Sequence, residues 1–352
     1  MKRKFFLSSY LKKAIKGKKP ALAHLLDRSK IINVMELFRY NSLTIFNYHR
    51  IFRNNLSTCF DEKVFGTSEA DFEKQMHWLK ENKAVFLSEE EVVSYYKAEK
   101  ILPQRSVLIT FDDGYKDNFD LAFPVLKSLE IPAIYFLPTN MITERKLCWW
   151  DLISFFIKKT KKKTIFVKGK EMSLTNEQER EKAIDFLLQL MKREKESYTQ
   201  DLLDVLSVEC EVAFPSLGEQ DAQLMSWKEV KEIMGHGVSI GSHTNSHRVL
   251  ATLDEKTQFE ELQSSKEILE ERLSCRIRSI SYPVGDYTAF TDTTKALAKR
   301  AGYDLGFSFK TGVNYSYITD PFDVKRLEPA DDFITFKSTV IAPRIFSIRS
   351  SQ

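Results

Sequence analysis

The stretch that most constrains the fold is an apolar run over residues 107–111 that ends abruptly in Asp112, Asp113 and Gly114. The run is continuous rather than alternating in polarity, which is typical of a parallel strand buried on both faces. Carboxylates at the end of such a strand are costly unless they are solvated, paired or bound to a metal ion. Gly114 permits a sharp turn that lets both side chains face one pocket. An acidic turn capping the next helix is the simplest alternative, and the stretch alone leaves it open.

Short predicted strands alternate with helices of about 10–15 residues around this stretch, which predicts βαβ units and a parallel sheet. Ser88 with Glu91 and Ser226 with Glu229 form capping boxes that mark two helix starts. Roughly seven or eight strand–helix pairs favour a barrel over an open sheet, and in such barrels the carboxyl ends of the strands carry the chemistry. The predicted strands cover residues 43–49, 84–87, 107–111, 132–137, 238–241, 278–282, 305–309 and 324–327.

The alternation is interrupted over residues 141–225, a segment that we call the insertion. It holds five lysines between Lys158 and Lys163 and a charged amphipathic stretch over residues 175–206, so we expect it to be partly helical. The lysine run is either a solvated loop or a contact for an anionic group such as a phosphate. The predicted domains are a basic N-terminal arm (1–41), a catalytic domain (42–340) that carries the insertion, and a C-terminal tail (341–352).

The composition indicates a soluble globular protein, with 43% hydrophobic and 29% charged residues. A net charge of +4 does not favour a nucleic-acid partner, and four widely spaced cysteines indicate reduced thiols. The arm has eight Lys or Arg residues before residue 20, without the apolar segment of a signal peptide. We therefore expect a cytoplasmic protein whose basic arm either rests on the inner, anionic membrane face or is simply solvated.

His243 and His247 lie four residues apart, just after the predicted strand at 238–241. On a helix or in a tight turn this spacing places both imidazoles on one side, where they can bind one metal ion. Two histidines and one carboxylate leave positions on the ion open to water and substrate. The second carboxylate of the Asp112–Asp113 pair is then free to act as a base on the attacking water.

Three motifs in this order resemble those of the polysaccharide deacetylase family, the NodB-homology domain of carbohydrate esterase family four. They run from Thr110 to Gly114, from Ser242 to His247 and from Tyr282 to Gly285. The resemblance implies a distorted (β/α) barrel that removes N- or O-acetyl groups from glycans with one divalent metal ion, for which we expect Zn²⁺. It implies Asp112 as the general base, and the metal ligands that it implies are Asp113, His243 and His247.

The third motif also departs from the family's pattern. The backbone N–H of Val284, after Tyr282 and Pro283, matches the group that stabilises the oxyanion. The motif lacks the arginine that often precedes its proline, so the group that orients the base is left open. Asp323 and Arg326 are candidates for lining the site, and a surface ion pair accounts for them equally well.

The departing amine or alkoxide needs a proton, which many family members supply from a late histidine. This sequence has no histidine after His247. His49, in the segment from Asn47 to Arg50, is similar to the early Tyr-His motif of the poly-N-acetylglucosamine deacetylase branch, and the resemblance implies His49 as the general acid. A histidine that merely packs or hydrogen-bonds in the core is the alternative.

The leading hypothesis is a deacetylase acting on N-acetyl groups of a glycan or of a lipid- or nucleotide-linked sugar. One alternative is a non-catalytic glycan-binding protein on the same fold, although a binding module has no need of both carboxylates. Another is a non-haem iron oxygenase, since those enzymes also use two histidines and one carboxylate. Aromatic side chains could stack on sugar rings or pack the core, and the candidates are Trp149, Trp150, Tyr282 and Tyr287.

Overall fold

The computed structural model describes residues 19–28, 42–53, 59–60, 65–191, 197–315, 320–330 and 332–341. Apart from α2 (Lys19–Arg28), the predicted N-terminal arm lies outside these ranges, as does the tail after residue 341. The predicted membrane contact of the arm (1–41) therefore falls outside the described residues, except for the segment in α2. Across the described ranges, no helix combines the length and the apolar character needed to cross a bilayer.

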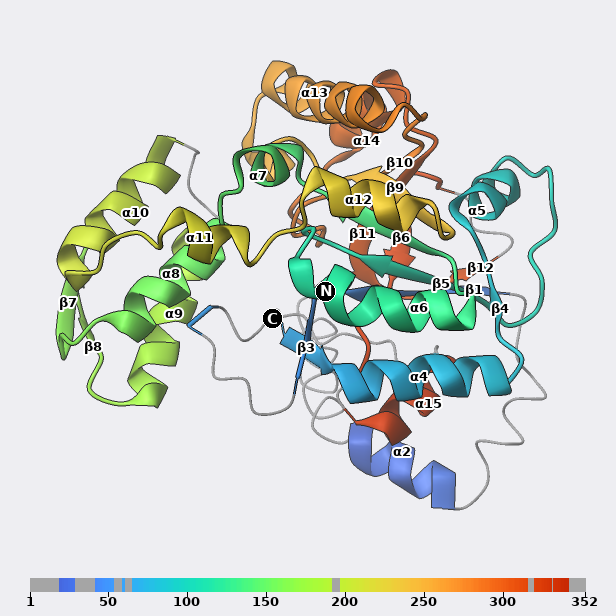
Figure 1. Ribbon diagram of the computed structural model, residues 1–352, viewed down its shortest axis with the longest axis horizontal. Helices are drawn as coiled ribbons and strands as arrows, with labels where there is room; N and C mark the ends of the chain where they lie inside the picture. The colour runs from blue at the N-terminus through green and yellow to red at the C-terminus, as the bar shows by residue number, and fades with distance from the viewer. Residues whose placement is uncertain are drawn as a thin grey trace, which may run out of the picture.

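Seven strands of the described chain form a parallel sheet that curls into a nearly closed barrel, which confirms the predicted fold class (Figure 1). Hydrogen bonds join its two edges: the Asn47 N–H donates to the Leu327 carbonyl at 2.9 Å, and the Leu327 N–H to the Ile45 carbonyl at 2.7 Å. In spatial order the strands are β1 (Ser42–Tyr48), β5 (Ser106–Phe111), β6 (Ala133–Leu137), β9 (Val238–Ser242), β10 (Ser279–Ser281), β11 (Leu305–Thr311) and β13 (Val324–Arg326).

Apart from the insertion, four further short strands of the described residues lie outside this ring. β4 (Val85–Phe86) pairs with β5 in parallel, and β12 (Asn314–Tyr315) pairs with β1 antiparallel. β2 (Arg50–Phe52) and β3 (Phe65–Ser68) form a small sheet of their own. β2 begins one residue after His49, so the strand predicted over residues 43–49 ends at Tyr48 and leaves His49 in the connection.

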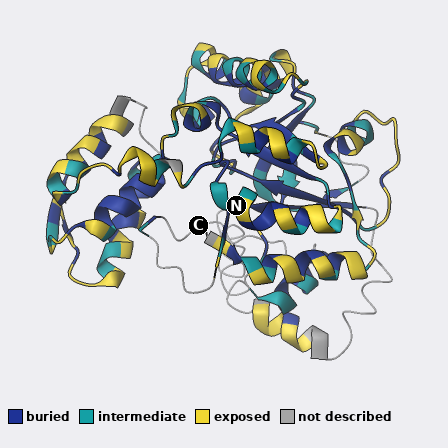
Figure 2. Ribbon diagram, in the orientation of Figure 1, coloured by how far each residue is buried: buried dark blue, intermediate teal, exposed yellow. Residues whose placement is uncertain are grey.

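Helices cover the barrel, with their inner faces buried and their outer faces exposed, while the strands themselves are buried (Figure 2). Both predicted capping boxes form, at Ser88 with Glu91 and at Ser226 with Glu229. A π-helical turn, η2 (Asn118–Ala122), was not predicted. The other helices around the barrel are α4 (Glu69–Glu81), α5 (Glu89–Tyr96), α6 (Phe123–Leu129), α7 (Thr139–Glu144), α12 (Trp227–Met234), η3 (Leu250–Thr252), α13 (Glu255–Leu273), α14 (Asp292–Arg300) and α15 (Phe333–Ile341).

The insertion forms a lobe beside the barrel, at the left of Figure 1. Its helices pack on one another through apolar side chains such as Phe156, Leu187 and Leu206. The antiparallel pair β7–β8 was not predicted, and Lys158 and Lys162 of the lysine run bond within the protein, to the Phe60 carbonyl and to Glu211. Its elements are α8 (Trp149–Lys159), β7 (Thr164–Val167), β8 (Lys170–Ser173), α9 (Glu177–Met191), α10 (Ser197–Cys210) and α11 (Leu217–Asp221).

A buried carboxylate, Glu89 at the start of α5, accepts a hydrogen bond from Ser279 at the amino-terminal end of β10. Burial raises the pKa of Glu89 from 4.5 to about 7. The folded protein therefore holds this proton where the unfolded chain has lost it, so Glu89 lowers stability progressively as pH rises from about 4.5 to about 7.

We expect Glu89→Gln to stabilise the protein at pH 8 by about 2–3 kcal/mol, with little gain at pH 4.5, because the amide stays neutral. Thermal unfolding of both proteins at the two pH values measures this difference. Glu90→Gln, at the exposed neighbouring position, is the control. Equal shifts in melting temperature at both pH values would contradict the prediction.

Candidate active site and metal centre

The predicted site residues meet at the carboxyl ends of neighbouring barrel strands. Asp112 follows β5, His243 follows β9 and Tyr282 follows β10. Each continues the sheet by one hydrogen bond, because their N–H groups donate to carbonyls of the adjacent strand: Asp112 to Tyr48 at 3.0 Å, His243 to Leu137 at 2.9 Å and Tyr282 to Phe307 at 3.0 Å. The register of the parallel sheet thus brings residues from distant motifs to one rim.

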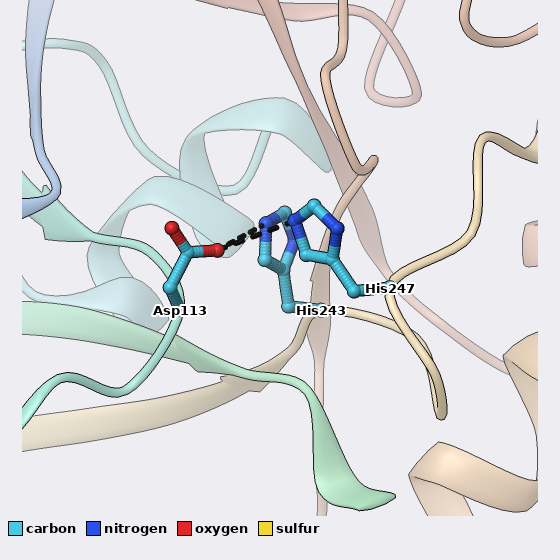
Figure 3. A group of neighbouring side chains, drawn as sticks. All are labelled: Asp113, His243 and His247. Carbon is cyan, nitrogen blue, oxygen red and sulfur yellow. Dashed lines mark ion pairs between the residues drawn. The ribbon is translucent and has the colours of Figure 1, made fainter. Parts of the chain in front are cut away.

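Asp113, His243 and His247 form a compact buried group (Figure 3). The Oδ1 atom of Asp113 lies 3.4 Å from Nε2 of His243 and 3.2 Å from Nε2 of His247. This oxygen is buried and makes no hydrogen bond of normal geometry within the described part of the chain. One ligand atom from each residue falls within 4.8 Å of the others, and this donor set suits a divalent ion of the zinc type.

The two imidazoles are held in different ways. His243 donates from Nδ1 to the Ser281 carbonyl at 2.8 Å, which leaves its Nε2 lone pair directed toward Asp113. His247 lies in a turn rather than on a helix, and both Thr244 and His247 have positive φ, 64° and 57°. Such backbone is costly for residues other than glycine. Here the neighbouring structure holds it, since the Thr244 hydroxyl accepts from the His247 N–H at 3.1 Å.

A carboxylate of α13 secures the same turn. Glu261 accepts hydrogen bonds from the Asn245 N–H at 3.1 Å and from the Ser246 N–H at 2.9 Å. The Ser246 hydroxyl donates to its other oxygen at 2.6 Å. The spacing of the two histidines therefore brings them together through a braced loop, the second of the two conformations that the sequence allowed.

Within this group, the effects of neighbouring charges on the pKa values oppose the effects of burial. Desolvation raises the pKa of Asp113, but the two imidazoles outweigh it and lower that pKa well below its ordinary value. Desolvation lowers the pKa of His243, yet the two carboxylates raise it overall. The pKa of His247 is lowered, chiefly by burial. Asp113 is thus ionised at neutral pH, as a metal ligand must be.

The carboxylate of Asp112 is oriented by Arg326. The sequence motifs had left the identity of this orienting group open. Its guanidinium grips the carboxylate with two parallel bonds, Nη1 to Oδ1 and Nη2 to Oδ2, both 2.9 Å long. Arg326 is 1% exposed and Asp112 is 2% exposed, so the pair is desolvated. Although burial raises the pKa of Asp112, Arg326 and His243 outweigh it and lower that pKa overall.

Asn47, a residue with no role predicted from the sequence, completes this network. Its Nδ2 donates to Oδ2 of Asp112 at 3.0 Å, and its Oδ1 accepts from Arg326 at 2.6 Å and from the Thr110 hydroxyl at 2.7 Å. The Ser281 hydroxyl accepts from Arg326 at 2.8 Å. The available signal for Asn47 was a polar amide near the carboxyl end of a fully buried barrel strand.

His49 lies beside this network. Its Nε2 atom is 4.0 Å from Oδ2 of Asp112, and its ring meets the edge of Phe309 with centroids 5.7 Å apart. The His49 side chain is 27% exposed, whereas those of His243 and His247 are 2% and 8% exposed. The His49 side chain thus lies close to Asp112 and is also accessible to solvent.

The third motif makes a strained turn. Val284, a β-branched residue, has φ of 62°, and the Gly285 N–H donates to the Pro283 carbonyl at 2.6 Å across it. Within the described residues, the Val284 N–H donates no hydrogen bond. The Tyr282 side chain is buried, stacks on Phe290 and donates to the Phe322 carbonyl at 3.2 Å, so it packs the core.

Asp323 lies apart from the network around Asp112. It pairs with Lys310 at 2.8 Å, which matches the ion-pair interpretation rather than a place in the site. Of the two late candidates, Arg326 therefore contacts Asp112 and Asp323 does not.

The fold and the site together define a barrel with a candidate metal centre at its carboxyl rim, and a family comparison agrees. The sequence profile described as "Polysaccharide deacetylase" matches residues 99–306, more than half of the chain. The chain belongs to the polysaccharide deacetylase family. This confirms the family that the three motifs indicated.

Curated relatives carry a more specific name. The chain is 37% identical over 125 residues to "Poly-beta-1,6-N-acetyl-D-glucosamine N-deacetylase" of Staphylococcus aureus and 36% identical over 129 residues to the protein of the same name of Staphylococcus epidermidis. These matches cover 33% and 34% of the chain, and 43% and 44% of the relatives' length. The chain thus matches less than half the length of these relatives.

Two solved structures share the fold. The Streptococcus pyogenes deacetylase PplD, in complex with acetate, superposes with a TM-score of 0.57 at 18% identity, covering 86% of this chain and 99% of PplD. IcaB from Ammonifex degensii gives a TM-score of 0.55 at 20% identity, covering 85% of this chain and 97% of IcaB. At these identities the likeness concerns the fold.

Proposed function

We propose that this protein is a metal-dependent hydrolase that removes N-acetyl groups from a glycan, with β-1,6-linked poly-N-acetylglucosamine as the first substrate to test. The observation that carries the proposal is the buried Asp113–His243–His247 group next to a carboxylate, Asp112, that Arg326 holds in place. The sugar and the bond are those in the name of the staphylococcal relatives, poly-β-1,6-N-acetyl-D-glucosamine N-deacetylase.

In this proposal Asp113, His243 and His247 hold one divalent ion, most simply Zn²⁺. When bound, the ion acts as a Lewis acid on the acetyl carbonyl and on the attacking water. Asp112 takes the proton of that water. Its carboxylate is ionised at neutral pH, since Arg326 lowers its pKa, and the bonds from Arg326 and Asn47 fix its orientation.

His49 then protonates the departing amine. Its partial exposure places it where a bulky glycan can approach, on the same rim as Asp112. The oxyanion of the tetrahedral intermediate needs a preorganised donor, and the unpaired Val284 N–H is suited to that role. The strained turn supports this assignment, because strain of this kind concentrates at functional sites.

The deciding experiment measures acetate release by the purified full-length chain before and after metal removal. Its substrates are oligomers of β-1,6-linked N-acetylglucosamine, their β-1,4-linked isomers, a nucleotide-linked N-acetylglucosamine and a lipid-linked one. We expect release from at least one of these, loss of release on chelation and recovery when Zn²⁺ is restored. Glycan binding without acetate release would favour a non-catalytic protein, and oxygen consumption with bound iron would favour an oxygenase.

The predicted cytoplasmic location and the membrane contact of the arm stay predictions.

His49→Ala should lower kcat by about 100-fold while the protein keeps its full metal content, because a general acid contributes about this much and does not bind the ion. Turnover and metal stoichiometry, measured on the same preparation, check both halves. His77→Ala is a matched control, since His77 lies exposed on α4 beside Glu73. Full activity in His49→Ala would remove His49 from the mechanism.

A further inference from the structure

The insertion is built into the metal centre rather than appended to the barrel. Its last residues run beside the loop that follows Asp113, where Tyr115 and Leu224 form an antiparallel bridge. The Lys116 N–H donates to the Gln223 carbonyl at 2.8 Å, and the Met225 N–H donates to the Gly114 carbonyl at 3.0 Å. The loop carrying the metal-site carboxylate is therefore tied to the end of the insertion.

The first helix of the insertion reaches the same place from the other side. The indole of Trp150 on α8 lies against the His247 imidazole, with ring centroids 4.5 Å apart and planes inclined by 56°. Its Nε1 donates to the Tyr115 hydroxyl at 2.8 Å, and that hydroxyl donates to Oδ2 of Asp151 at 2.8 Å. Trp150 is 7% exposed, while Tyr115 and Asp151 are fully buried.

Arg50, one residue after His49, supports the ring of Tyr115. Its guanidinium carbon lies 4.4 Å from the centroid of that ring. Arg50 also bonds to Asp117 at 2.8 Å and to the Gln223 side chain at 2.7 Å. The position of Tyr115, and through it of Trp150, is thus set by buried polar contacts on both sides.

The two histidines differ in how their rings are oriented. A ligating histidine is normally oriented by a hydrogen bond from its other ring nitrogen. His243 has such a bond, to the Ser281 carbonyl. Nδ1 of His247 is buried and has no hydrogen-bond partner within the described ranges. Its ring is instead packed against Trp150, so packing must supply the orientation that a hydrogen bond supplies for His243.

We propose that Trp150, Tyr115 and Asp151 are a positioning unit through which the insertion holds His247 in its metal-ligating orientation. The proposal rests on the proposed metal dependence and deepens it, because it makes the metal affinity of the barrel depend on α8. These residues act through His247 and are not catalytic. The insertion is on this view a structural part of the metal centre.

The test is the metal affinity of the full-length protein, measured by competition with a chelator for Zn²⁺ and from the absorption spectrum of the Co²⁺-substituted protein. Trp150→Leu should weaken Zn²⁺ binding by about tenfold or more, the usual effect of losing an outer contact of a ligand, and should alter the Co²⁺ spectrum. Trp150→Phe keeps an aromatic face against His247 and should retain most of the wild-type affinity for Zn²⁺.

The control is Phe156→Leu, which also replaces a buried aromatic ring of α8 by leucine. The Phe156 ring is fully buried and packs on Phe214. This substitution should lower stability while leaving the affinity and the Co²⁺ spectrum unchanged. Tyr115→Phe removes only the hydroxyl that joins Trp150 to Asp151. If Trp150→Leu does not fold, the metal affinity of Tyr115→Phe tests the positioning role instead. Tyr115→Phe should weaken Zn²⁺ binding several-fold.

Wild-type affinity and spectrum in Tyr115→Phe, or in a folded Trp150→Leu, would overturn the positioning role. That outcome differs from failure of the proposed function. If the wild-type protein binds Zn²⁺ but releases no acetate from any substrate, the deacetylase proposal fails, while the comparison of affinities still tests the role of Trp150.

Discussion

Asp112→Asn should reduce kcat by about 10²- to 10⁴-fold without loss of bound metal, because the amide keeps the shape of the side chain but cannot accept a proton from water. The proposed metal ligands Asp113, His243 and His247 are untouched by the change. The measurements are the initial rate of acetate release at saturating substrate and the metal content of the same sample. Loss of turnover together with loss of metal would instead indicate a role for Asp112 in building the metal centre.

The matched control is Asp323→Asn, a change of the same kind at a carboxylate that pairs with Lys310 outside the site. We expect it to keep nearly all activity. Unchanged acetate release in Asp112→Asn would exclude Asp112 as the base, whatever the control does.

Arg326→Gln should destabilise the protein by about 3–5 kcal/mol at neutral pH, because it leaves the Asp112 carboxylate buried without its cation. The effect depends on pH. Arg326 lowers the pKa of Asp112 in the folded protein, so the pair contributes its stability above the ordinary aspartate pKa and loses it as pH falls through the lowered value. Without Arg326, burial raises the pKa of Asp112, so the folded variant takes up a proton and regains stability as pH falls from 7 toward 4. Denaturant unfolding at pH 7 and pH 4 should therefore show a larger difference between variant and wild type at pH 7.

Turnover of Arg326→Gln should fall as well, since Asp112, the proposed general base, loses both of its parallel bonds. Lys325→Gln, at the less buried neighbouring position of β13, controls for the loss of a positive charge on that strand. If Arg326→Gln has wild-type stability at pH 7, the Arg326–Asp112 pair is not desolvated, contrary to the burial of both residues in the structure.

Much of the fold could be read from local patterns. The runs predicted as strands over residues 107–111 and 132–137 fall in the buried parallel strands β5 and β6, and the capping boxes at Ser88 and Ser226 start helices as predicted. Such signals depend on neighbours within a few residues. The insertion was recognisable only as an interruption, since its hairpin β7–β8 and its contacts with the metal centre depend on packing between distant segments.

The sequence by itself determined the family, the barrel and the candidate site residues Asp112, Asp113, His243 and His247, because each motif is a short run whose residue types and order are specific. Only the tertiary structure decided what holds these groups. Arg326 lies 214 residues from Asp112 along the chain, and Trp150 is almost a hundred residues from His247. Barrel closure between β13 and β1 creates the first contact, and docking of α8 on the barrel creates the second. Neither contact leaves a local pattern, because the partners meet only when the sheet has curled and the insertion has packed against its rim.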